Sequence, residues 1–305
     1  MTTTRTGAVI DLPAAVDFMA RHARLLDRRR VGVLLGSGSP EAALAALAAY
    51  RNPDGGYGWG LEPDLRSASS QPGAALHAFE VFGDIAPATD PAAAALCDWL
   101  DSVSLPDGGV PFALPVPDPA GTAAWWAGAP QDVSSLQITA IVAAVAHRTA
   151  RHDPAVAAHP WLARATAYCL GAAGDATEAV EPPQALVLAF ALRFLDAVHD
   201  TVPKAAGIIE GLRRFVPADG VIPVQGGTQD EAIRPLDIAP EPGRPVRALF
   251  SWDSIDAELR RLAAGQQPDG GWRVEYAEFS PAGALEWRGH ATVRALQVLQ
   301  ANGLL

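Results

Sequence analysis

The chain has 305 residues, of which 49% are hydrophobic and 19% charged, so it can bury a large core and is not expected to be disordered. Its formal net charge of −11 opposes binding to nucleic acid through bulk electrostatics. The N-terminal region has no apolar run long enough for a signal peptide or a membrane span, and we therefore expect a cytoplasmic protein.

Helix-starting signals recur along the first half of the chain. Hydrophobic periodicity predicts helices at residues 13–29, 41–50, 72–82, 91–103 and 133–149. Ser39 and Asp90 each stand before a proline, the favoured order of a capping side chain and a first-turn proline. Asp132 is placed to cap the helix at 133–149 in a similar way.

The second half alternates between two kinds of helix. Further helices are predicted at residues 161–170, 182–198, 205–215, 256–264 and 286–300. We interpret residues 138–146 and 185–194 as apolar on every side, which is typical of helices buried all round. The helices at 205–215 and 256–264 instead carry arginines on one side. This alternation predicts two concentric rings, with the apolar helices in the inner ring.

Four Asp-Gly pairs punctuate the helices. They begin at Asp54, Asp107, Asp219 and Asp269. The aspartate can bond its own turn and the glycine can adopt a positive φ, so each pair favours a tight turn. The spacing is about 50 residues or twice that, which predicts a degenerate turn at residues 171–175.

This repeat predicts an all-α fold, an α/α toroid of about five or six helical hairpins formed by residues 1–305 as one domain. Residues 226–245 are rich in proline and glycine and interrupt the repeat. We expect them to form an irregular insert, either reaching over the mouth of the ring or lying as a solvated loop.

The turn at residues 266–272, QQPDGGW, resembles the repeat of squalene–hopene and oxidosqualene cyclases. The DGGY and DGGV turns at 54–57 and 107–110 resemble those of protein prenyltransferase β subunits. This resemblance to the terpenoid cyclase/prenyltransferase superfamily implies an α/α toroid, in which Gln266 and Trp272 would tie neighbouring hairpins together. It also implies a terpene-cyclase-like protein that binds an apolar isoprenoid or polyene in a central cavity, with acid-initiated cyclisation by an isomerase or lyase as the expected activity.

The chain departs from the motifs of that superfamily at two places. Cyclases protonate an alkene with the middle acid of a DxDD motif, whereas residues 132–135 are Asp-Val-Ser-Ser and retain only the first acid. Prenyltransferases bind zinc through an aspartate two residues before a cysteine, and neither Cys97 nor Cys169 has one. We therefore expect no metal and no cofactor, and two reduced core cysteines.

The candidate site residues are acids, histidines, aromatics and an arginine. The candidate catalytic residues are Asp132, Glu62, Asp64 and His290, and the candidate substrate-binding residues are Trp59, Trp125, Trp126, Trp252, Arg288 and His77. His290 shares a helical stripe with Glu286, Arg294 and Gln297, and this stripe would face the cavity if its helix is an inner one. Arg66, Arg234, Arg244, Arg273 and Arg288, if they converge, could hold a diphosphate or carboxylate.

Structural roles and other functions stay open for these residues. Glu62 and Asp64 could cap a helix, the tryptophans could fill the core, and the stripe of His290 could be solvated. The expected partner is a small apolar substrate, with peripheral membrane contact through it. The alternatives are a carbohydrate-active toroid with an acid-lined cleft and a non-catalytic binding or scaffold protein whose centre is packed shut.

Overall fold

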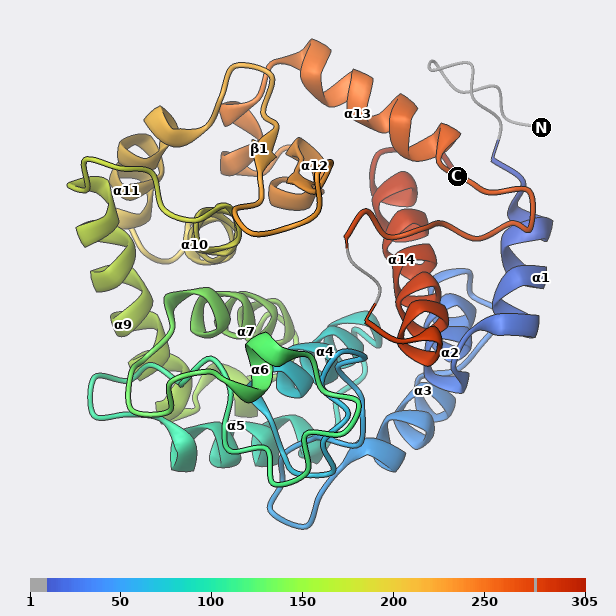
Figure 1. Cartoon of the computed structure of the whole chain (residues 1–305), viewed down its shortest axis with the longest axis horizontal. Coiled ribbons are helices and arrows are strands. Elements are labelled where there is room, and N and C mark those ends of the chain that lie inside the picture. Colours follow the sequence, from blue (N-terminus) through green and yellow to red (C-terminus); the bar gives the residue numbers. More distant parts are fainter. Residues whose placement is uncertain (1–9, 277–278) are drawn as a thin grey trace.

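The computed structural model describes residues 10–276 and 279–305, and its helices form a two-layered ring (Figure 1). The outer layer consists of α1 (Leu12–His22), α3 (Pro40–Leu47), α5 (Pro91–Val103), α9 (Pro160–Thr177), α11 (Lys204–Leu212) and α13 (Trp252–Ala264). The inner layer consists of α2 (Leu25–Leu34), α4 (Pro72–Asp84), α7 (Leu136–Ala150), α10 (Ala185–Val198), α12 (Pro235–Ile238) and α14 (Pro281–Ala301). Each outer helix precedes its inner partner, so the predicted all-α toroid is confirmed.

Short elements complete the connections. They are α6 (Ala124–Ala127), α8 (Pro154–Ala157), the 3₁₀ turns η1 (Ala48–Tyr50), η2 (Arg213–Phe215) and η3 (Pro245–Leu249), and the paired strands β1 (Ile222–Pro223) and β2 (Ala232–Ile233). The insert at 226–245 therefore contains β2 and α12. Figure 1 shows α12 inside the ring between α10 and α14, where a full inner helix would otherwise stand.

The core lies between the two layers and continues through the inner one. In α7 all residues from Ile138 to Ala146 are buried, and α7 packs along both α4 and α10. Four of these buried residues of α7 have small side chains, the alanines at 140, 143, 144 and 146. Small side chains of this kind let several helices approach one another around a narrow centre.

Three Asp-Gly turns join neighbouring outer helices in the same way. Gly55, Gly108 and Gly270 have φ values of +92°, +91° and +95°. A Cβ atom on these glycines would lie 2.8, 2.8 and 2.0 Å from the carbonyl oxygens of Ala95, Arg164 and Ala14, in α5, α9 and α1 respectively. Only glycine fits both the backbone angle and the close approach. Each of these turns therefore packs the end of one outer helix against the next outer helix.

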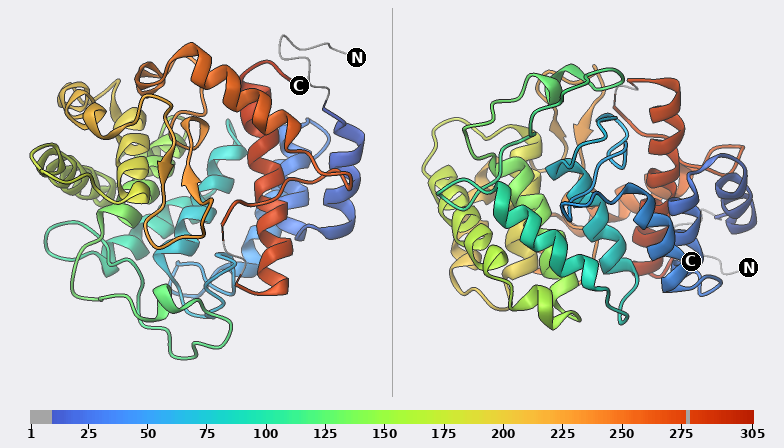
Figure 2. Two further views of the ribbon diagram at one scale, coloured as in Figure 1. Left: turned by 45° about the horizontal axis from the view of Figure 1, so that its top comes forward. Right: turned by 90° about the horizontal axis from the view of Figure 1, so that it is seen from below.

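The last turn closes the ring on the first helix. The Gln266 side chain accepts a hydrogen bond from the Asp11 backbone at 2.9 Å and donates one to the Asp11 carbonyl at 2.8 Å. Figures 1 and 2 show the first helices (blue) and the last helix, α14 (red), on the same side of the ring, and α1 and α14 are in contact. Trp272 donates from its indole nitrogen to the Leu262 carbonyl at 2.7 Å, which holds the turn to the end of α13.

Three local expectations were wrong. The single helix predicted at 13–29 is two helices, because Ala23 is extended and the buried Arg24 turns inward to Asp27 and the Leu61 carbonyl. The turn predicted at 171–175 does not form, since α9 continues through it and neither Gly171 nor Gly174 has a positive φ. Asp132 does not cap α7; Ser135 accepts the capping hydrogen bond from Ile138.

Among the described residues, no helix is both long enough and apolar enough to cross a membrane.

Candidate functional site at the centre of the ring

A cavity of about 30 Å³ lies where the inner helices meet. Its wall includes Glu80, Arg148, Arg193, His290, Arg294 and Gln297, with Arg30 beside them. These residues come from α2, α4, α7, α10 and α14. A space of this size holds about two water molecules, or one small charged group in their place.

One part of the wall is a network of paired charges. The buried Arg30 donates to Asp84 at 2.8 Å and to Glu80 at 3.3 Å, and Arg148 donates to the other oxygen of Asp84 at 3.0 Å. Gln297 donates to the same oxygen of Asp84 at 2.8 Å. Burial alone would lower the pKa of Arg30, but the carboxylates of Asp84 and Glu80 raise it above its usual value. These two arginines are therefore compensated within the protein.

Arg193 is in a different electrostatic position. Its side chain reaches the cavity from α10, and it forms no hydrogen bond or ion pair with any residue in the described ranges 10–276 and 279–305. Burial and the positive charges of Arg294 and Arg148 lower its pKa to about 10, against the smaller opposing effect of the Glu80 and Asp237 carboxylates. Arg294 is itself paired with Asp237 at 3.2 Å. At neutral pH Arg193 therefore stays charged, and no carboxylate of the described residues is bonded to it.

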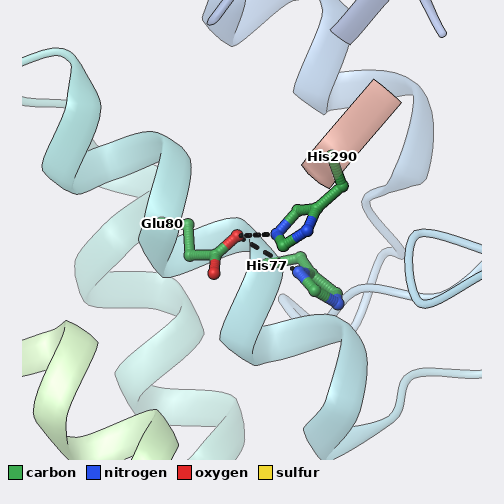
Figure 3. Close-up of side chains that lie close together, drawn as sticks. All are labelled: His77, Glu80 and His290. Carbon is green, nitrogen blue, oxygen red and sulfur yellow. Dashed lines mark hydrogen bonds and ion pairs between the residues drawn. The ribbon is translucent and has the colours of Figure 1, made fainter. Parts of the chain in front are cut away.

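His77, Glu80 and His290 form a compact cluster at the edge of the cavity (Figure 3). Glu80 Oε2 lies 3.2 Å from His77 Nδ1 and 3.0 Å from His290 Nε2, and the two rings are nearly perpendicular with centroids 5.0 Å apart. One donor atom from each residue lies within 4.8 Å of the others, so the cluster has the composition and spacing of a metal site. Burial alone would lower the pKa of His77, but its bonds to Glu62 and Glu80 raise it to about 9.

Two predicted acids lie beside this cluster. Glu62 and Asp64 are both buried, and Glu62 Oε2 is 3.0 Å from His77 Nε2. Asp64 accepts a hydrogen bond from the indole of Trp287 at 3.0 Å, and Trp287 packs edge-on against both histidines. Burial and the charge of Glu62 raise the pKa of Asp64 to about 6. The structure thus brings four of the sequence-predicted residues together: Glu62, Asp64, His77 and His290.

The predicted aromatic residues do not converge on the centre. The side chains of Trp59, Trp125 and Trp252 are 57%, 51% and 72% exposed. Trp126 is buried, but it stacks on Phe112 with ring centroids 4.4 Å apart. Three of these indoles therefore lie at the surface and the fourth packs against a phenylalanine, while the centre of the ring is polar.

Asp132 and the predicted arginines also lie elsewhere. Asp132 is exposed in the loop before α7. Arg288 pairs with Asp269 at 2.8 Å and lies over the Phe18 ring, so it braces the closing turn. Arg66, Arg234 and Arg244 each pair with separate carboxylates. The centre is built by other arginines.

The sequence did not single out Arg30, Arg148 and Arg193. Arg30 follows the end of the helix predicted at 13–29, and Arg148 stands at the end of an apolar run. Arg193 offered a readable signal, because it is the one charged residue within 185–194, a stretch interpreted as apolar on every side. A lone charge in a buried helix needs a partner or a ligand.

An apolar pocket exists away from this centre. Its volume is about 290 Å³, and its lining includes Pro182, Leu188, Phe215, Ile222 and Val224. It lies between the start of α10, η2 and β1. This apolar pocket lies at the side of the inner layer, whereas the apolar space was expected at the centre, where the cavity is small and charged.

Comparison with known proteins supports the architecture alone. No protein-family model and no curated protein matches the chain. Among solved structures it is similar to the crystal structure of a protein from Actinoplanes, at 17% sequence identity and a TM-score of 0.56, over 95% of this chain and 98% of that chain. At this identity the likeness shows a shared fold.

Proposed function

We propose that the protein binds a small ligand through a phosphate or carboxylate group held in the central cavity by Arg193. The observation that carries this proposal is the position of Arg193. It lies in the cavity wall with two further guanidiniums beside it and without a carboxylate partner among the described residues. A planar guanidinium offers paired donors that match a carboxylate or phosphate.

The charge balance around the cavity supports an anion. Glu80 and Asp84 offset Arg30 and Arg148, and Asp237 offsets Arg294. Arg193 is left with one positive charge. A ligand with at least one negative charge would compensate it, and would also relieve the repulsion between Arg193 and its two arginine neighbours.

The cost of this arrangement argues against a purely structural centre. Buried charges are expensive to desolvate, and replacing them with well-packed apolar residues is often neutral or stabilising. A scaffold ring could fill its axis with aliphatic side chains, as α7 does with isoleucine, valine and alanine on its other faces. An arginine at the axis that pairs with none of the described residues is better explained by a ligand that binds there.

The size of the cavity restricts what enters it. About 30 Å³ accommodates a charged head group, and the remainder of a larger ligand would have to extend outside it. The proposal is therefore a binding protein or enzyme for a small anionic metabolite.

Isothermal titration with inorganic phosphate, pyrophosphate and acetate tests this proposal. We expect at least one of them to bind the wild type, with affinity reduced at least about 10-fold in Arg193→Gln, the loss of one charged contact. Arg260→Gln is the matched control, because Arg260 pairs with Asp256 on the outer helix α13. Equal affinity in Arg193→Gln and the wild type would overturn the proposal, as would the absence of binding by all three anions.

Isoprenoid binding is a second proposal, which the apolar pocket supports. At about 290 Å³ this pocket is large enough for a short isoprenoid, and its lining is mainly proline and aliphatic or aromatic side chains. Geraniol and farnesol should raise the melting temperature of the wild type and of Arg193→Gln. Val224→Trp, which fills the pocket, should abolish this shift. No shift in the wild type would count against the proposal.

A further inference from the structure

We propose that His77, Glu80 and His290 bind one divalent transition-metal ion at the edge of the central cavity. This inference goes beyond anion binding, and it rests on this set of three ligands rather than on Arg193. Two imidazoles and one carboxylate form a ligand set that zinc and related metals accept, and catalytic zinc sites keep a fourth position open.

The spacing of the donor atoms fits an ion. Metal bonds of about 2.0–2.2 Å place neighbouring ligand atoms about 2.9–3.6 Å apart in octahedral or tetrahedral sites. Glu80 Oε2 lies at 3.2 Å from His77 Nδ1 and 3.0 Å from His290 Nε2, so two edges of the polyhedron already have this length. The third edge is within 4.8 Å, a distance that a small rotation of one imidazole can close.

The groups behind the cluster orient it for coordination. Glu62 lies 3.0 Å from His77 Nε2 and can accept a hydrogen bond from the Nε2–H group. The other ring nitrogen, Nδ1, faces Glu80 and would bind the ion in place of the proton that it shares with Glu80. A carboxylate behind a ligating histidine is the usual outer partner in metal sites. His77 and Glu80 are one turn apart on α4, and His290 comes from the facing helix α14, so rigid elements hold all three (Figure 3).

Arg30 is a cation that opposes an ion here, and Arg148, Arg193 and Arg294 lie farther along the same cavity wall. Its guanidinium lies 3.3 Å from Glu80 but 2.8 Å from Asp84, and Asp84 is also bonded by Arg148. Asp84 is thus shared between two arginines, and Glu80 would be shared between Arg30 and the ion. Glu62, which lies 3.0 Å from His77 Nε2, adds a second carboxylate beside the ion.

The open position of the ion would face the cavity. Glu80 and His290 both line this space, so a water molecule or an oxygen of a bound anion could complete the coordination. The ion would then act on the ligand from one side and Arg193 from another. An ion in this place would polarise the bound oxygen as a Lewis acid.

Titration of the untagged, chelator-treated chain with Zn²⁺ and Co²⁺ tests the inference. We expect one ion per chain, and a visible Co²⁺ absorption band typical of low coordination. His77→Gln, Glu80→Gln and His290→Gln should each weaken binding at least about 100-fold, since each removes a ligand, and Glu62→Gln about 10-fold, since it removes an outer partner. Circular dichroism of each variant establishes that it is folded.

The matched controls separate this site from other histidines and from the anion site. His159→Gln removes a histidine that pairs with Asp98 elsewhere and should leave ion binding unchanged. Arg193→Gln should retain the ion while losing the anion, so failure of one proposal is distinguishable from failure of the other. Absence of stoichiometric binding by the wild type, or undiminished binding by folded His77→Gln and His290→Gln, would overturn the inference.

Discussion

At the scale of single residues, Arg193 is the side chain on which the proposed anion site depends. It is an arginine within a buried helix, faced by two other arginines, and its lowered pKa expresses the resulting destabilisation of the charged form. A group of this kind destabilises the empty protein and becomes favourable when an anion occupies the cavity. Function and stability should therefore respond to its replacement in opposite directions.

Arg193→Met is expected to raise the free energy of unfolding by about 1 kcal/mol in anion-free buffer, because it removes an uncompensated charge and retains the apolar stem. Arg294→Met should instead lower it, since Arg294 bonds Asp237 and the Leu236 carbonyl. Urea denaturation of the three proteins measures both effects. An equally large destabilisation in both variants would show that Arg193 is already satisfied.

His147 gives a pH dependence that is separate from the site. It is partly buried and bonded to Thr166 at 2.7 Å, and burial followed by the charge of Arg151 lowers its pKa to about 4. The unfolded chain, with a pKa near 6.5, binds the proton first as the pH falls. Stability from the neutral imidazole is thus complete above about pH 6.5 and is lost on acidification towards pH 4.

Comparison of the wild type with His147→Gln isolates this effect. Between pH 7 and pH 5 the wild type should lose about 1–2 kcal/mol more unfolding free energy than the variant, whose side chain does not titrate. Denaturant curves at both pH values give the difference. Parallel losses in the two proteins would contradict the assignment of a buried neutral histidine.

At the scale of elements, the predictable features are those that depend on neighbours in the chain. Asp107-Gly108 specifies its turn because the aspartate bonds Gly109 and the glycine adopts a positive φ. The glycines at 171 and 174 lack a preceding aspartate, and ordinary helical packing decides their conformation. The break at Ala23 was not predictable because Arg24 is held by the Leu61 carbonyl, which is distant in sequence.

Gly171→Ala should stabilise the protein by about 0.5–1 kcal/mol, since alanine restricts the unfolded chain and favours α9. A Cβ atom at this position has no neighbour within 4 Å. Gly211→Ala, also in a helix, should destabilise it, because its Cβ would lie 2.8 Å from Thr177. Thermal unfolding of the wild type and of both variants measures these changes in stability. Destabilisation by Gly171→Ala would indicate that α9 is interrupted there.

At the scale of the whole molecule, the toroid follows from the repeat, while the site requires the closed ring. The stripe of His290, Arg294 and Gln297 was readable from helical spacing, and these three residues line the cavity. Arg30, Glu80 and Arg148 join them only after helices from opposite ends of the chain meet around one axis. Local sequence patterns contain no information on which distant helices come into contact. The architecture was therefore predictable, whereas the residues that line the central cavity were not.

Ring closure itself makes a prediction at Gly270. In Gly270→Ala the added Cβ would lie only 2.0 Å from the Ala14 carbonyl oxygen. We therefore expect this variant to lose more than about 3 kcal/mol of unfolding free energy and to show faster amide hydrogen exchange in α1. Gly226 also has a positive φ, but a Cβ atom there would have no neighbour within 4 Å. Gly226→Ala should therefore lower the free energy of unfolding by only about 1 kcal/mol. Similar costs for both would mean that the last turn does not press against the first helix.

The most direct test of the central claim is an anomalous diffraction map of a crystal soaked in selenate, a tetrahedral oxyanion that stands in for phosphate. We expect a selenium peak in the cavity beside Arg193 and between Arg148 and Arg294, and we expect it to be lost in Arg193→Gln crystals. A cavity without a peak, with the Arg193 guanidinium bonded to a carboxylate of its own chain, would contradict it.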